Sequence, residues 1–548
     1  MGVYVAATWQ VHDSHALPMT RPFARLLLAA ALASALPAPA QQAASVRLPA
    51  LGESAAEDFT PGTERRLGEQ IMAEVRRDPA YLDDPLLLDH LQSVWAPLLA
   101  ASRARGNIGP DLDTAFAWEA FLVRDRSVNA FALPGGFVGV HLGLIAMTAT
   151  RDELASVLAH ELSHVSQRHI ARSIANSSRQ SLVGMAALLL GILAASRSNS
   201  PDATQAVIVG SQAAVAQGQL NFSRDMEREA DRIGWGVHTD AGFAPMGVAA
   251  MFERMDQAYR LVDNGAFPYL RSHPLTVDRI GEARARLDAA PAARAPLKPT
   301  LDQLLMQARA RVLMDTAVQS LRRLQAFDAS SLTGADRVAA LYASALASLE
   351  LREPARAQAA LDAALPLARA GAPVDARAQL ALSLAQSQIW LASGQAARAL
   401  TALDALHPPA PGSQRPLLLA RAQAALEVAR GGGAGTQPAL RASTEALQTW
   451  VAELAGDAAA WSALAQGADL LGLKLRALRA EAEAQAAVGD LGGAIDRLRA
   501  AQRQSRAASG APDFIEASII DARLRDLTAR RRAQLAEARG APRDERNP

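Results

Sequence analysis

The most informative absence in this 548-residue chain is cysteine, of which there is none. A chain without cysteine has no disulfide, no thiol nucleophile, no cysteine ligand for zinc and no acylated lipoprotein cysteine. Any metal site must therefore be built from histidine and carboxylate side chains. The chain has ten histidines from which such a site can be made.

Lysine and aromatic residues are also scarce. Lys298 and Lys474 are the only lysines, and phenylalanine, tryptophan and tyrosine together make up 4% of the chain. Lysine plus arginine (56) nearly equals aspartate plus glutamate (55), so no excess of positive charge favours nucleic acid as a partner. We therefore expect no nucleic-acid binding. The length exceeds that of a single hydrophobic core and predicts two or more folded units.

Residues 1–40 have the pattern of a targeting segment rather than of a fold. Two arginines precede an apolar run over residues 26–36, and the small residues 38–40 form a cleavage site. The residues before Met19 do not fit a signal peptide, so Met19 is the expected natural start and the preceding residues are an extension. This pattern predicts export, with a mature chain that begins near Gln41. The alternative is an uncleaved membrane anchor, for which the apolar run is short.

Hydrophobic periodicity predicts a mainly α chain with one small sheet. From residue 62 to 99 apolar residues recur at helical spacing. Two short β-like runs follow at residues 121–123 and 130–140, and helical patterns dominate from 151 to 289. We expect these elements to form one domain over residues 41–295.

After Ala289 the composition shifts to alanine, leucine and arginine, and short turns separate helical segments. The segments that begin at Glu353, Gly394 and Gly489 resemble one another where one helix ends and the next begins. Such helix pairs resemble tetratricopeptide repeats (TPRs), which stack into a solenoid with a concave binding face. We expect an α-helical TPR-like solenoid over residues 296–548. The alternative is an alanine-rich helical bundle.

Two apolar runs, residues 182–195 and 203–215, flank a polar turn. The first is shorter than the roughly 20 residues that a membrane span requires. A buried or interfacial helical hairpin is therefore favoured over a span. The alternative is an integral membrane protein.

The segment His160–His164 has the sequence H-E-x-x-H and lies in an apolar helical pattern that starts near Asp152. Residues four apart lie on one face of a helix, so the two imidazoles can bind one zinc ion. Glu161 can then lie beside the open coordination position. The alternative is a pair of packed histidines on a buried helix.

A hydrolytic zinc site keeps three protein ligands and one water, so a third ligand is required. His169 follows His164 by five residues on what the pattern predicts to be the same helix, and this spacing turns it off the ligand face. The segment 223–231 is a better source, because Glu227 and Asp231 share one face of a second helix. One carboxylate can bind the metal while the other hydrogen-bonds a ligand histidine.

Together with the strand Asn129–Gly136, these two motifs resemble those of gluzincin metalloproteases, which include prenyl-protein endopeptidases and bacterial heat-shock membrane proteases. The resemblance covers residues 62–289. The layout, with a signal peptide before and helical repeats after, is most similar to periplasmic proteases that maintain outer-membrane protein assembly in Gram-negative bacteria. It implies a zincin-type helical protease domain with a small β-sheet, followed by a TPR-like solenoid.

The resemblance implies a role for each matching residue. His160, His164 and Glu227 would hold one Zn2+ ion per chain. Glu161 would act as the general base, and Asp231 would hydrogen-bond a ligand histidine. No cofactor other than zinc is implied.

Two further segments gain a role from the same resemblance. Residues 128–131 would lie along the cleft and pair with an extended substrate. His273, followed by Pro274 and Leu275 with Arg279 a turn beyond, matches a histidine that plugs the zinc site in the periplasmic relatives. It would occupy the water position in a latent state or stabilise the oxyanion in an active one. The alternative is a surface histidine before a turn.

The expected function is that of a periplasmic zinc metalloendopeptidase that degrades misfolded or stalled envelope and outer-membrane proteins. The repeats would dock partners such as the outer-membrane assembly machinery, and a peripheral membrane contact is compatible with the apolar runs. The alternative is a TPR-type assembly chaperone for outer-membrane proteins, with latent proteolysis. The intact ligand set favours the enzyme, because a vestigial site would be free to lose Glu161.

Overall fold

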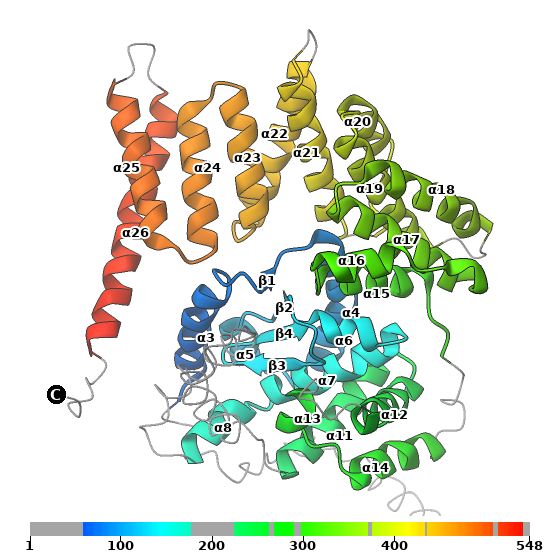
Figure 1. Cartoon of the computed structure of the whole chain (residues 1–548). Helices are drawn as coiled ribbons and strands as arrows, with labels where there is room; N and C mark the ends of the chain where they lie inside the picture. The colour runs from blue at the N-terminus through cyan, green and yellow to red at the C-terminus, as the bar shows by residue number, and fades with distance from the viewer. Residues whose placement is uncertain are drawn as a thin grey trace, which may run out of the picture. The chain divides into compact units, whose positions relative to one another are not determined.

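The computed structural model describes eight ranges of the chain, which all lie in one compact unit from Ser54 to Pro548. These ranges are 59–176, 224–261, 268–289, 297–370, 375–410, 412–432, 436–507 and 513–540. The expected signal peptide (1–40) and the apolar runs (182–195 and 203–215) lie outside them. The described chain is mainly helical with one small sheet, which confirms the predicted fold class (Figure 1).

The described sheet has four strands in the order β1-β2-β4-β3. Their bounds are β1 Tyr81–Leu82, β2 Glu119–Val123, β3 Ala130–Leu133 and β4 Phe137–His141. β2 and β4 are parallel, whereas β1 pairs antiparallel with β2 and β3 pairs antiparallel with β4. Within the described sheet, β3 is therefore an edge strand.

Two glycines let the β3–β4 hairpin pack closely against a helix. Gly135 and Gly136 have φ angles of +77° and +89°, which are unfavourable for residues with a side chain. A Cβ on Gly135 would lie 2.7 Å from the Cα of Arg65 in helix α3 (Pro61–Val75). Glycine at this turn therefore allows α3 to lie against the end of the hairpin.

Two long helices build the core beside the sheet. α4 (Pro85–Ala104) begins after its N-cap Asp84 and buries Trp95 completely. The indole N–H of Trp95 donates a 2.9 Å hydrogen bond to the carbonyl oxygen of Trp118. α7 (Arg151–Ser166) is buried along most of its length and packs against α4.

Smaller helices complete this part of the chain. They are α5 (Pro110–Ala115), α6 (Leu142–Met147), α8 (His169–Asn176), α11 (Arg224–Asp240), α12 (Met246–Leu261), α13 (Pro268–Ser272) and α14 (Val277–Asp288). Of these, α11 and α12 both pack against α7. α7 is thus the central helix of this part.

Beyond residue 297 the described chain is entirely helical. Its elements are α15 (Leu301–Leu313), α16 (Val318–Gln325), η2 (Ala329–Ser331), α17 (Gly334–Glu350), α18 (Pro354–Ala370), α19 (Ala376–Ala392), α20 (Ala396–Asp404), α21 (Arg415–Arg430), α22 (Thr436–Glu453), α23 (Ala458–Leu470), α24 (Lys474–Ala487), α25 (Leu491–Ala507) and α26 (Phe514–Gly540). From α16 onward each helix packs against the next, and α15, α17, α19 and α21 also contact one another in turn. Such neighbour-to-neighbour packing is typical of a solenoid.

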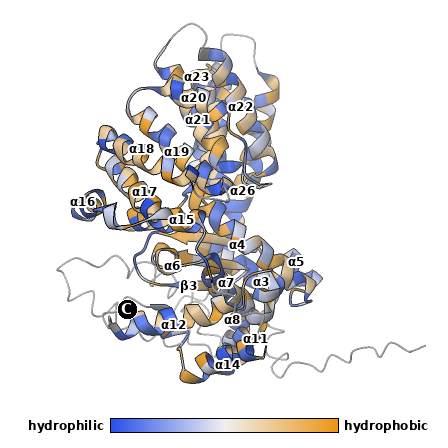
Figure 2. Ribbon diagram, turned by 90° about the vertical axis from the view of Figure 1, so that its right-hand side faces the viewer, coloured by the Kyte–Doolittle hydropathy of each residue, from blue (hydrophilic) through white to orange (hydrophobic). Residues whose placement is uncertain are grey.

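These helices carry polar and apolar residues side by side (Figure 2). In the described part of the chain, no helix is long and apolar enough to cross a bilayer.

Buried polar contacts join α15 to the part of the chain before residue 289. Arg309 on α15 donates to both carboxylate oxygens of Asp84, at 2.8 Å and 2.6 Å. His90 on α4 lies 2.9 Å from Asp302, again with both side chains buried. The side-chain amide of Gln303 donates to the carbonyl oxygen of Thr148, the residue that follows α6. Helices α15 to α26, the helical region, are therefore attached to both α4 and α6 through α15.

Candidate metal centre

Helix α7 places the two histidines of the H-E-x-x-H motif one turn apart. The helix follows its N-cap Thr150, whose hydroxyl accepts a hydrogen bond from the backbone N–H of Glu153. His160 is 5% exposed, and Glu161 and His164 are fully buried. The Nε2 atoms of the two histidines lie 2.9 Å apart, so both rings point to one location.

Helix α11 brings Glu227 to the same location. α11 approaches α7 closely at Gly234, where a Cβ would lie only 3.2 Å from the backbone of Ala159. The Glu227 carboxylate then lies 3.4 Å from His160 Nε2 through one oxygen and 3.4 Å from His164 Nε2 through the other. The structure thus brings together the three residues that the sequence identified as metal ligands.

His273 reaches the site from the segment that follows α13. It is buried, and its Nδ1 lies 2.9 Å from Glu227 Oε1 and 3.4 Å from His160 Nε2. Its Nε2 lies 3.6 Å from Glu161 Oε1. His273 is therefore part of the cluster in this structure, not a surface histidine.

The donor atoms fit a zinc ion. Ligand atoms of the four residues lie within 4.8 Å of one another: His160, His164, Glu227 and His273. Imidazole nitrogens whose lone pairs converge require a shared cation or proton. Within the described residues, neither oxygen of the buried Glu161 carboxylate accepts a hydrogen bond. Since a buried charge is costly without compensation, a bound cation suits this environment.

Burial and neighbouring charges set the protonation of the site. Burial opposes a charge on His160, but hydrogen bonds to Asp231 and Glu227 outweigh it and raise its pKa to about 9. Burial would raise the pKa of Glu227, yet His273 and His160 hold it well below its usual range. Because zinc binds neutral imidazole, its binding must displace a proton from His160.

Asp231 contacts the Nδ1 atom of His160, and Arg279 contacts Asp231. His160 Nδ1 lies 2.9 Å from Asp231 Oδ1. The guanidinium of Arg279 donates two hydrogen bonds to Asp231, at 2.6 Å and 2.8 Å, and its Nη1 lies 3.0 Å from Glu227 Oε2. Burial alone would raise the pKa of Asp231, but these partners lower it to about 2. Asp231 therefore stays ionised, and it lies beside His160, where the sequence analysis expected it.

The expected position of His169 was wrong. The pattern placed it on the same helix as His164, but α7 ends at Ser166 and α8 begins at His169. Between them Arg168 has a φ of +53°, which reverses the chain. His169 is fully buried, and its Nδ1 lies 2.9 Å from Nδ1 of His164. Residues Tyr269 and Arg172 near the site were likewise not identified from the sequence.

The edge strand β3 contacts α7, the helix that carries the motif. Its partner strand β4 lies on one side, and the other side is unpaired within the described sheet. Just before β3, the carbonyl oxygen of Val128 accepts a 3.4 Å hydrogen bond from the backbone N–H of Tyr269 in α13. The segment that carries His273 thus also contacts the start of the edge strand.

Comparison with known proteins places the site in a family context. Residues 100–287 match Peptidase family M48. The "Beta-barrel assembly-enhancing protease" of Escherichia coli K12 is 33% identical over 260 residues, which is 47% of this chain and 51% of that protein. A Vibrio cholerae protein whose name includes the same words is 37% identical over 290 residues, 53% of this chain and 56% of the relative.

A further relative matches a shorter part of the chain. The "Mitochondrial metalloendopeptidase OMA1" of Schizosaccharomyces pombe is 36% identical over 163 residues, 30% of this chain and 44% of that protein. The alignments with the two bacterial relatives span about half of their length. The family match, over residues 100–287, covers the segment that holds the metal centre.

Proposed function

We propose that this chain, whose residues 100–287 match peptidase family M48, is a zinc-dependent endopeptidase. One observation carries the proposal: His160, His164 and Glu227 converge on one location, with the buried Glu161 next to it in the same helix. Three protein ligands with an acid–base group beside them are what zinc-dependent hydrolysis requires.

The chain's own residues divide the chemistry between them. A zinc ion bound there would act as a Lewis acid toward water and the scissile carbonyl. Glu161 would take a proton from the attacking water and return it to the leaving amine nitrogen. Asp231 and Arg279 would keep His160 oriented throughout, since both contact it or its partner at hydrogen-bond distance.

An extended peptide is the substrate shape that suits the site. The unpaired side of β3 offers backbone N–H and C=O groups to a further strand. Because β3 contacts α7, a peptide paired with residues 128–131 would run beside the motif. Unfolded or stalled polypeptides have such extended segments, whereas folded proteins rarely offer them.

Zinc content is the first test. We expect about one zinc per chain, lost in His160→Ala and His164→Ala and weakened in Glu227→Gln, because each change removes one ligand. Metal analysis of the purified chain, beside casein cleavage with and without a chelator, measures this. His407→Ala, which changes an exposed histidine of the helical region, serves as the matched control and should retain the metal. A wild-type chain that binds no zinc would disprove the proposal.

His273 acts as a latch in this proposal. Its imidazole lies among the ligands, where it can take the fourth zinc position, and α13 contacts the start of the edge strand. A chain in this state is folded and metal-loaded but nearly inactive. A client or partner that binds the open form better would release it.

The His273→Ala variant tests the latch. If about one chain in ten is open at rest, removing the latch should raise basal casein cleavage about tenfold. Val277→Ala, at a neighbouring residue that is 84% exposed, should leave the rate unchanged. A lower rate in His273→Ala would instead show oxyanion stabilisation, and an unchanged rate with unchanged zinc would remove both roles.

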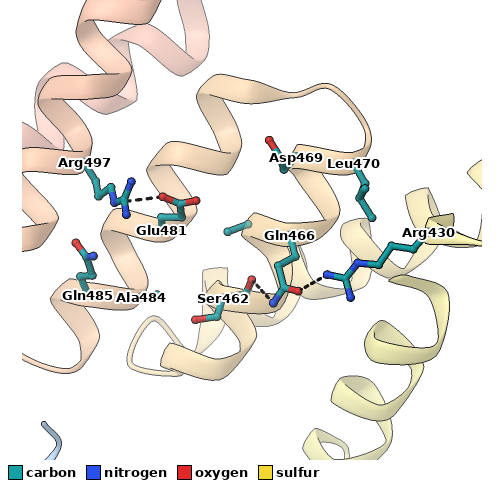
Figure 3. A pocket seen from close by; sticks show the side chains of 10 residues that line it. Arg430, Ser462, Gln466, Asp469, Leu470, Glu481, Ala484, Gln485 and Arg497 are labelled. Atoms are coloured by element: carbon teal, nitrogen blue, oxygen red, sulfur yellow. Dashed lines mark hydrogen bonds and ion pairs between the residues drawn. The ribbon is translucent and has the colours of Figure 1, made fainter. Parts of the chain in front are cut away.

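The relatives' names and the sequence pattern of residues 1–40 support a proposed cellular setting. We place the chain in the periplasm, where it would degrade stalled or misfolded outer-membrane proteins. The helical region would dock partners such as the assembly machinery. A polar hollow of about 570 Å3 between α21, α23, α24 and α25 suits such docking (Figure 3). In it Arg430 donates to Gln466, and Arg497 pairs with Glu481.

A further inference from the structure

We propose that His169 is a positioning residue that fixes the ring of the zinc ligand His164, and that Glu229 in turn fixes His169. The inference rests on the proposed function, because it assigns His164 to the metal. It adds a side chain that does not bind the ion but decides which nitrogen of a ligand is free to do so.

The contacts form an unbroken chain away from the metal centre. His169 Nδ1 lies 2.9 Å from His164 Nδ1, and His169 Nε2 lies 3.1 Å from Glu229 Oε2. The same carboxylate oxygen accepts a 2.9 Å hydrogen bond from Nη1 of Arg172. His164 and His169 are both fully buried, so water does not compete for these positions.

The direction of each hydrogen bond in this series follows from the carboxylate of Glu229. Glu229 is a carboxylate held by Arg172, so it accepts, and His169 must carry its proton on Nε2. Nδ1 of His169 is then a bare lone pair. It can only accept, and the donor is Nδ1–H of His164. The remaining nitrogen of His164, Nε2, is thereby left without a proton and faces His160 and Glu227.

The backbone makes this contact available. Arg168, with its φ of +53°, turns the chain between α7 and α8 and brings His169 back toward the helix it has just left. The Arg168 side chain is itself held by Glu64 of α3, at 3.1 Å. The turn is therefore fixed by this contact, and the ring of His169 is held against His164.

Helix α11 supports both ligand histidines. Asp231 contacts His160 directly, whereas Glu229 reaches His164 only through the imidazole of His169. Glu227, in the same helix, is a ligand itself. The two histidines consequently differ. Nδ1 of His160 lies against a charged carboxylate, whereas Nδ1 of His164 donates to a neutral ring, which is a weaker hydrogen-bond acceptor.

Two substitutions of His169 separate positioning from packing. Asparagine keeps an acceptor, because its Oδ1 is bonded to Cγ as Nδ1 is in histidine, whereas leucine fills a similar space without one. Both lose the bond to Glu229. In the full-length chain we expect His169→Leu to weaken zinc binding about 10–100-fold, as for other residues behind metal ligands. We expect His169→Asn to recover most of that loss.

The measurement is zinc affinity by competition with a chelator, beside the visible spectrum of the cobalt-loaded chain. The cobalt spectrum should change in His169→Leu and remain close to wild type in His169→Asn. His141→Asn is the matched control, because this buried histidine contacts Ser127 and lies outside the cluster. Circular dichroism and the Tm of the zinc-free chains show whether each variant folds.

Three outcomes would overturn the inference. Wild-type affinity in His169→Leu would show that His169 does not act on the metal. Equal loss in the leucine and asparagine variants would show that His169 only ties α8 to α11. The leucine variant could fail to fold. In that case, an asparagine variant that folds but binds zinc about 10–100-fold more weakly than the wild-type chain leads to the same conclusion. Absence of zinc from the wild-type chain would be a failure of the proposed function instead.

Discussion

Replacing Glu161 by glutamine is expected to lower kcat for casein about 10²–10⁴-fold, the usual contribution of a general base. Glutamine has the same shape but cannot take a proton from water. Burial raises the pKa of Glu161 above that of an exposed glutamate, with His273 and His160 opposing. Zinc content should remain about one per chain, because Glu161 is not a ligand.

The separation of the two readouts is what makes this variant informative. A chain that loses both zinc and activity has lost its fold or a ligand, whereas one that keeps zinc and loses activity has lost its base. Glu282→Gln, which changes an exposed carboxylate on α14, is the control for the same chemical substitution and should cleave normally. Normal cleavage by Glu161→Gln would show that another group accepts the proton.

The two histidines of the predicted metal site could be placed together from the sequence because they depend on local geometry. The spacing of His160 and His164 fixes their common face on any helix. Glu227 lies 63 residues beyond His164 (227 − 164), and the sequence offered it as a candidate because it shares a helical face with Asp231, before the resemblance implied its role. The structure explains why it reaches the site: Gly234 lets α11 lie against α7.

His169 could not be placed because its position depends on where α7 ends. The helical pattern continues across Gln167 and Arg168, and neither residue is a glycine or a proline that would mark a turn. Arg168 adopts a positive φ while its side chain is held by Glu64, over 100 residues earlier in the chain. A long-range contact therefore decides a local turn. Periodicity within the helix gives no information about it.

The attachment of α15 to α4 was equally beyond the sequence. It pairs Arg309 with Asp84, residues separated by 225 positions. Arg309 and the nearby Arg311 lie on the same helix, and the sequence alone does not distinguish the buried arginine from one on a solvent-exposed face. The boundary at residues 295 and 296 and the assignment of the repeats to a known class stay predictions.

Removing one partner of the buried Asp84–Arg309 pair should lower the stability of the chain by several kcal/mol. Both side chains are less than a tenth exposed, and the Tyr342 hydroxyl, a second partner of the guanidinium, lies 3.4 Å from it. Burial would raise the pKa of Asp84, but Arg309 lowers it, so the charge is retained. We expect Arg309→Met to lower the free energy of unfolding by about 3–5 kcal/mol, because it leaves a buried carboxylate without a counter-charge.

A double-mutant cycle separates the pair from other effects of each residue. Asp84→Asn keeps an acceptor for the backbone N–H of Leu87 at the start of α4, so the helix cap survives while the charge is lost. The double variant should be destabilised by less than the sum of the single changes. Glu253→Gln, which breaks the exposed pair with Arg284, is the control and should cost less than about 1 kcal/mol.

The unfolding transition shows whether this pair couples the metal centre to the helices next to α15. α15 is held to α4 and α6 by buried polar contacts and by apolar packing, because residues of all three helices belong to one hydrophobic core. In the wild-type chain we expect the metal centre and the helices next to α15 to unfold in a single step. In Arg309→Met the helical region should unfold first, at lower urea, while zinc remains bound. Simultaneous loss of helix and zinc in that variant would show that apolar packing of α15 is sufficient to couple them.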